Sequence, residues 1–84
     1  MNAIERTSIA KGVAIYIVDR ILVEKPLSAS ELESVARSVT EDMGIKDSNE
    51  CNCIAALAVD YVSNDYKVVT ELKDGALWIT YKGR

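Results

Sequence analysis

The spacing of apolar residues divides the chain into three segments with a helical period and a last one that alternates. Residues 2–25 form the first segment, where Asn2 could cap a helix and Glu5 could reach back to it. Apolar side chains then occupy most of the helical circumference. One face carries Ile4, Ile15, Val18 and Leu22, and another carries Ile9, Val13, Tyr16 and Ile17.

A helix that is apolar all round is buried on all sides. A small monomer can hardly bury one helix in this way, so we expect a central helix that also pairs with a second subunit. The expected homodimer interface is the face formed by Ile9, Val13, Tyr16 and Ile17. The alternative is a strand over residues 13–18, because β-branched side chains dominate there.

Pro26 and Leu27 end the first segment, and the residues that follow have the pattern of a helix start. Ser28 is the expected N-cap, and Glu31 would complete a capping box. Gly44 would then end the helix in the left-handed conformation that glycine adopts easily. The expected buried stripe, at helical spacing, is Leu32, Val35, Ala36, Val39 and Met43.

The third segment begins at Asp47 or Ser48, either of which could cap a helix. Asn64 is the expected end of this helix. Its apolar residues recur at helical spacing, and the expected buried face is Ile54, Leu57, Ala58, Tyr61 and Val62. The opposite face would expose Asn49, Asn52, Cys53, Ala56 and Asp60.

Residues 66–84 alternate in polarity around Asp74-Gly75, which favours a two-residue type I′ turn. The face expected to cover the helices pairs Leu72 with Leu77, Thr70 with Ile79 and Val68 with Tyr81. The outward face pairs Glu71 with Trp78, Val69 with Thr80 and Lys67 with Lys82. Turn chemistry and polarity agree on this register, which directs Trp78 away from the core of the hairpin.

These elements predict an α+β fold, three helices followed by a C-terminal β-hairpin, in a single domain of residues 1–84. A short strand near residues 24–27 would extend the sheet. The order of elements resembles that of the winged helix-turn-helix superfamily, in which the hairpin is the wing. The resemblance is topological and covers the whole chain, and it implies a regulator that binds DNA. The second helix departs from it, being longer than is usual in a helix-turn-helix.

The distribution of charge argues against that activity. Residues 31–65 hold eight acidic side chains against Arg37 and Lys46, a net charge of −6. A surface that binds nucleic acid needs clustered Lys and Arg to displace counterions from phosphates. The third helix lies between Lys46 and Lys67, and no basic residue falls in that interval.

The reactive residues point to no catalytic site. The chain has no His, which excludes histidine catalysis and most zinc chemistry. Cys51 and Cys53 are two positions apart, and on a helix such side chains point roughly 200° away from each other. Glycine-rich phosphate loops, nucleophile elbows and acidic dyads are also missing. We therefore expect neither an enzyme nor a protein that holds a metal or a cofactor.

The longest apolar run, residues 13–18, is too short for a signal peptide or a membrane span and has charges on both sides. With one pair of closely spaced cysteines, the chain also offers no disulfide framework. We therefore expect a cytoplasmic protein that does not bind membranes.

Two surfaces are candidate binding sites. The outward hairpin face could anchor a protein partner, because Trp buries a large area at little entropic cost. Its members are Trp78, Val69, Glu71 and Thr80. Trp78 could instead pack on the first helix or on a second subunit. The residues that could contact DNA are Lys67, Lys73, Lys82 and Arg84 on the hairpin and tail, with Asn49 and Asn52 on the third helix. Lysines on an edge strand could equally serve to prevent aggregation.

Two hypotheses for function follow from these surfaces. The first is a non-enzymatic protein-interaction module, such as an adaptor, an accessory subunit or an inhibitor. Its acidic middle segment would suit a partner that handles nucleic acid, and mimicry of nucleic acid is one variant. The second is a dimeric DNA-binding regulator that contacts the DNA backbone through the wing. Charge disfavours the second.

Overall fold

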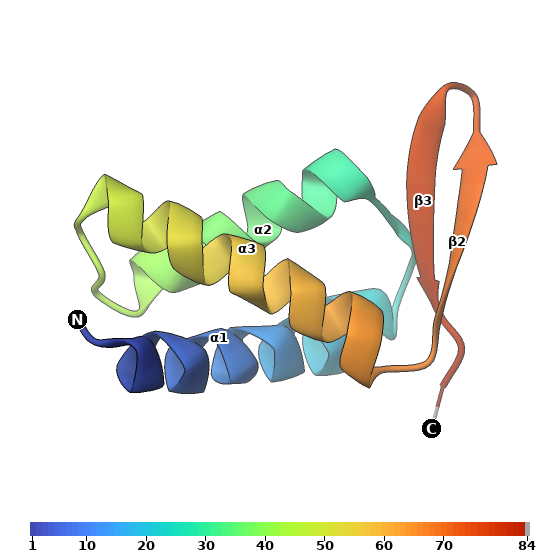
Figure 1. The fold of residues 1–84 in the computed structure, drawn as a ribbon. Helices are drawn as coiled ribbons and strands as arrows, with labels where there is room; N and C mark the ends of the chain where they lie inside the picture. Colours follow the sequence, from blue (N-terminus) through green and yellow to red (C-terminus); the bar gives the residue numbers. More distant parts are fainter. Residues whose placement is uncertain (84) are drawn as a thin grey trace.

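The computed structural model describes residues 1–83 and has the predicted order of three helices and then a C-terminal β-hairpin (Figure 1). Its elements are α1 (Ala3–Ile17), η1 (Val18–Leu22), β1 (Leu27–Ser28), α2 (Ala29–Asp42), α3 (Ser48–Asp65), β2 (Val68–Lys73) and β3 (Ala76–Tyr81). The three α-helices all lie to one side of the hairpin, and the tip of the hairpin stands clear of them (Figure 1). The predicted α+β fold is confirmed. Arg84 lies outside the described residues.

The hairpin has the predicted register at every pair, from Lys73 with Ala76 to Val68 with Tyr81. Asp74 and Gly75 have φ angles of 53° and 77°, as a type I′ turn requires. The predicted extra strand is present two residues long, at Leu27–Ser28, and pairs antiparallel with β3. The strand order is therefore β1-β3-β2.

Residues 13–18 are helical, so the alternative of a strand there is wrong. Asn2 caps α1, because its side-chain oxygen accepts a hydrogen bond from the backbone N–H of Glu5 at 2.8 Å. The helix continues as the π-helical turn η1, where the Val23 N–H bonds to the Val18 carbonyl at 3.1 Å. Both Val18 and Leu22 remain buried through this wider turn.

The prediction that Val13 and Ile17 form a dimer interface is wrong. Both side chains are fully buried in the core of a single chain. The two apolar faces assigned to this helix are also incorrect, since Ile4 and Ile15 are 81% and 50% exposed. The physical reason is that α1 packs against both α3 and α2. These two helices together cover one broad face of α1 and leave the opposite side exposed. Ile9 is partly buried and Tyr16 is 49% exposed.

The second helix starts as predicted, with a complete capping box between Ser28 and Glu31. Gly44 follows the helix with φ at +93°, as expected of its terminator. Met43, however, is 53% exposed and does not belong to the buried stripe. Thr40 is buried instead, and its hydroxyl donates a hydrogen bond to the Ala36 carbonyl at 2.7 Å. That internal bond allows a polar residue to replace an apolar one in the core.

The third helix is capped by Asp47, which accepts a hydrogen bond from the Glu50 N–H at 3.0 Å. It ends at Asp65, one residue beyond the expected Asn64. Its predicted buried face is confirmed, with Ile54, Ala58 and Val62 buried and Leu57 and Tyr61 packed against the core.

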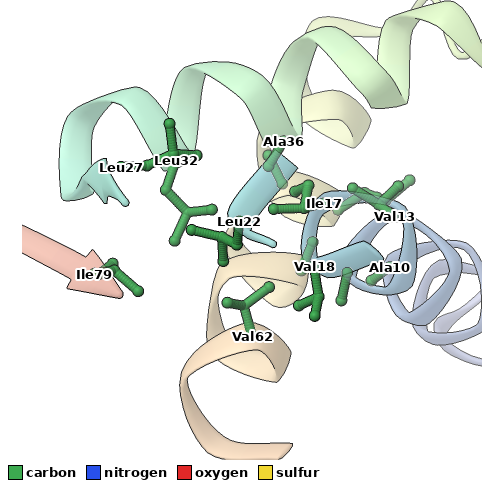
Figure 2. Packing of buried hydrophobic residues seen from close by; sticks show 14 residues of the cluster. Ala10, Val13, Ile17, Val18, Leu22, Leu27, Leu32, Ala36, Val62 and Ile79 are labelled. Atoms are coloured by element: carbon green, nitrogen blue, oxygen red, sulfur yellow. The ribbon is translucent and has the colours of Figure 1, made fainter. Parts of the chain in front are cut away.

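The core extends from the helices to the sheet through a few residues near β1 (Figure 2). Leu27 and Ile79 face each other across the β1–β3 pairing and are 3% and 4% exposed. Leu72 and Leu77 lie on the same face of the hairpin as Ile79, but they are 76% and 44% exposed. Their predicted burial is therefore wrong, because the distal half of the hairpin extends beyond the helices (Figure 1).

One ion pair connects the start of α1 to the start of α3. The Arg6 guanidinium donates to the two carboxylate oxygens of Glu50, at 2.8 Å and 3.3 Å. The hydrogen bond from Arg6 holds the pKa of Glu50 below its ordinary value. In the capping box, hydrogen bonds from Ser28 likewise hold the pKa of Glu31 below its ordinary value.

The orientation of α1 predicts that truncating Ile17 lowers the free energy of unfolding much more than truncating its near neighbour Ile15. Ile17→Ala should lower the free energy of unfolding by about 2–5 kcal/mol, because it opens a cavity in the core. Ile15→Ala removes a half-exposed side chain and should cost less than about 1 kcal/mol. Chemical denaturation of both variants measures the difference. Equal losses would contradict this orientation of the helix.

The ion pair between Arg6 and Glu50 predicts that the stability of the fold depends on pH. Since the folded chain lowers the pKa of Glu50, the pair stabilises the fold above the ordinary pKa of the carboxyl group. This contribution is lost as the pH falls through the lowered pKa. Unfolding free energies measured between about pH 5 and pH 2 should therefore fall less steeply for Glu50→Gln than for the wild type. The exposed Glu24→Gln is the control, and a slope unchanged by Glu50→Gln would refute the role of the pair.

Candidate functional site

The outer hairpin face consists of Val69, Glu71, Trp78 and Thr80, the four residues predicted to bind a partner. The register places Glu71 opposite Trp78 and Val69 opposite Thr80, so the four side chains form a compact group. They point away from the face that carries the buried Ile79. The structure thus brings all four together.

Trp78 lies in a shallow depression of about 260 Å³ on this face. The depression is lined by Pro26, Glu71, Lys73, Asp74, Trp78 and Thr80. Trp78 is partly buried there, between Glu71 on β2 and Ser28 on β1, and it is not part of the hydrophobic core. The alternative that Trp78 packs on the first helix is therefore wrong, and the alternative that it packs on a second subunit stays a prediction. Val69 beside it is 47% exposed.

Pro26 is a member of this depression that the sequence did not reveal. It is adjacent to the face only because β1 pairs with β3, which brings residue 26 beside the end of the hairpin strand. The signal in the sequence was weak, since a strand of two residues has no period to recognise. With Pro26 and Trp78 on one side and Glu71, Lys73 and Asp74 around them, the depression combines apolar surface with charges of both signs.

The hairpin lysines do not form a continuous basic surface. Lys67 and Lys82 are neighbours at the base of the hairpin, where the Lys82 N–H bonds to the Lys67 carbonyl at 2.7 Å. Lys73 is near the tip, about 20 Å further along the strand, because a strand rises about 3.3 Å per residue. The acidic Glu71 lies between them on the same face. Arg84, the fourth predicted phosphate contact, is outside the described residues.

The exposed face of α3 carries Asn49 and Asn52 as predicted. Asn52 borders a depression between α2 and α3, lined by Ser30, Glu33, Ser34, Arg37, Asn52 and Ala55. The basic residue of that lining, Arg37, donates hydrogen bonds to Glu41 and to the Ser48 hydroxyl, both at 3.1 Å. These bonds direct Arg37 toward protein groups rather than toward the two asparagines.

The two cysteines point apart, as the helical spacing predicted. Cys51 is buried and its thiol donates to the Ile45 carbonyl at 3.1 Å, whereas Cys53 is exposed. Within residues 1–83, no group of three or more His, Cys, Asp or Glu residues is placed to hold a metal ion. Over the same residues, none of the helices combines the length and the apolar character needed to cross a bilayer.

A second apolar surface, also unexpected, lies between α1 and α2. Its lining consists of Gly12, Tyr16, Val39, Asp42 and Met43. Tyr16 and Met43 are each about half exposed there. The exposure of Met43 arises because α2 ends at this point and nothing in the described chain covers it.

Comparison with known proteins places the chain in no group: no family model, no curated protein and no solved structure matches it.

Proposed function

We propose that this chain is a non-enzymatic protein-interaction module, such as an adaptor, an accessory subunit or an inhibitor, and that its outer hairpin face binds the partner protein. The observation that carries the proposal is the position of the single tryptophan. Trp78 is on a sheet face that lies outside the core, beside the exposed Val69.

The arrangement of elements supports a winged-helix type of domain. A short strand between α1 and α2 pairs with β3, and the strand order is β1-β3-β2. The hairpin is then the wing, and α2 and α3 correspond to the helix-turn-helix. In this proposal the wing contacts protein, because α3 carries no Lys or Arg to neutralise phosphates.

Trp78 has the properties of an interface anchor. Tryptophan is enriched among residues that dominate binding energy, and such residues lie in small pockets ringed by less important contacts. Here the depression supplies a partial pocket and the charges of Glu71 and Lys73 supply the ring. Two strands hold Trp78 in place from either side, which lowers the entropy lost when a partner binds.

The charge of the helices suggests the nature of the partner. The exposed acidic side chains of α2, α3 and the connection between them are Glu31, Glu33, Glu41, Asp42, Asp47, Asp60 and Asp65. A surface of one sign attracts proteins of the other sign and speeds their association. We therefore propose a partner with a basic surface, as proteins that handle nucleic acid have.

This proposal predicts that a change at Val69 abolishes binding without unfolding the chain. Val69→Arg places a charge in the apolar part of the outer hairpin face, and Val69 is exposed enough for the variant to fold. Affinity capture from the native host should recover the partner with the wild type and with Ser8→Arg, an exposed control on α1, away from the acidic helices and the hairpin. It should recover much less with Val69→Arg, by about tenfold or more. Equal recovery by all three would overturn the proposal.

The single tryptophan reports the same contact independently. Binding of the captured partner should shift the emission of Trp78 to shorter wavelength and reduce its quenching by acrylamide. Both changes follow from removal of water around the indole ring.

A DNA-binding regulator is the second candidate, favoured by the neighbouring Lys67 and Lys82 on the wing. If it is correct, binding to a DNA duplex should weaken steeply with added salt, with a slope near −0.9 for each phosphate contacted. Fluorescence anisotropy of a labelled duplex measures this slope for the wild type and for the Lys67→Gln and Lys82→Gln variants. We expect no duplex binding even at low salt, and a steep slope reduced by either variant would favour the regulator instead.

A further inference from the structure

Gly12 occupies an unusual position, in the middle of α1 and exposed to solvent. A Cβ atom added there would meet no heavy atom within 4 Å, so nothing in the single chain requires a glycine. Glycine weakens the interior of a helix more than any residue except proline. A glycine in such a place allows another backbone to approach the helix closely.

The residues around Gly12 form a stripe along one side of α1 and the turn that follows. Intervals of four, three, four and four residues place its members on a single helical face, and they are Glu5, Ile9, Gly12, Tyr16 and Arg20. We call this the Gly12 stripe. It borders α2, because Gly12 and Tyr16 line the apolar depression with Val39 and Met43.

Along the Gly12 stripe the side chains run from an acidic one (Glu5) through an apolar one (Ile9), the glycine and a second largely apolar one (Tyr16) to a basic one (Arg20). Two copies that run antiparallel therefore place Glu5 of each beside Arg20 of the other. They also place Ile9 of each beside Tyr16 of the other, with Gly12 next to the two-fold axis. A parallel pair would instead align like charges, which is unfavourable.

The charges at both ends of the Gly12 stripe are free to make this contact. Among the described residues, neither Glu5 nor Arg20 takes part in a salt bridge. The adjacent Arg6 is already bound to Glu50. Asp19, which precedes Arg20, lies on the α3 side, near Tyr66 at the end of that helix. Burial raises the pKa of Tyr66 above its ordinary value, and the nearby carboxylate of Asp19 raises it further.

We infer that the Gly12 stripe is the interface of a homodimer, in which α1 of a second copy of this chain packs antiparallel across it. Gly12 lets the two backbones approach, and the half-exposed Tyr16 and Met43 of each copy become covered. Closed two-fold symmetry uses the same patch on both copies, which a self-complementary stripe provides. This inference does not depend on the proposed function of the hairpin, which is on β2 and β3.

The test measures the dimer dissociation constant of the full chain by sedimentation equilibrium over a range of concentrations. Gly12→Gln fills the open space next to the axis with a good helix former, so the chain should fold at least as well. Its dimer should nevertheless dissociate more easily, by about tenfold or more. Ser38→Gln, an exposed position on α2, should leave the dissociation constant unchanged.

A charge exchange tests the antiparallel register. Glu5→Arg and Arg20→Glu should each weaken the dimer, and the double variant should restore it to near the wild-type value. A wild type that is monomeric at every concentration, a dimer indifferent to Gly12→Gln, or a double variant no better than the single variants would each overturn the inference. Since none of these changes touches Trp78, capture of the hairpin partner would be unaffected by them.

Discussion

The pairing of β1 with β3 is the constraint on which the position of the hairpin depends. Only two residues form β1, yet each has a second role. Leu27 is buried against Ile79 and continues the helical core into the sheet (Figure 2). Ser28 lies opposite Trp78 and is also the N-cap of α2, so a single residue links the sheet to the start of a helix. The pairing therefore fixes where the outer hairpin face lies relative to α2.

Local chemistry explains which parts of the fold could be predicted from the sequence. The caps at Asn2 and Ser28, the terminator Gly44 and the turn at Asp74-Gly75 depend on interactions within a few residues, and all four are confirmed. The register of the hairpin followed from its turn for the same reason. Errors arose where burial depends on how far a neighbouring element extends. Leu72 and Leu77 lie on the correct face but beyond the end of the helices.

The same distinction applies to the candidate surfaces. Alternation along a strand placed Trp78 and Val69 outward, which needed no knowledge of the rest of the molecule. Pro26 could not be assigned to the depression before the pairing of β1 was known. For α1, periodicity showed an abundance of apolar residues but not which of them face α2 and α3. Ile17 therefore proved to be core, whereas Tyr16 and the adjacent Gly12 remain on the surface.

The most direct test of partner binding by the outer hairpin face observes Trp78 itself in the presence of the captured partner. Because the chain contains one tryptophan, the ¹H–¹⁵N correlation spectrum of the ¹⁵N-labelled protein contains a single indole N–H signal. If the outer hairpin face binds the partner, this signal should shift when the unlabelled partner is added, together with the backbone signals of Val69 and Thr80. An indole signal that stays in place while signals elsewhere in the chain shift would contradict it.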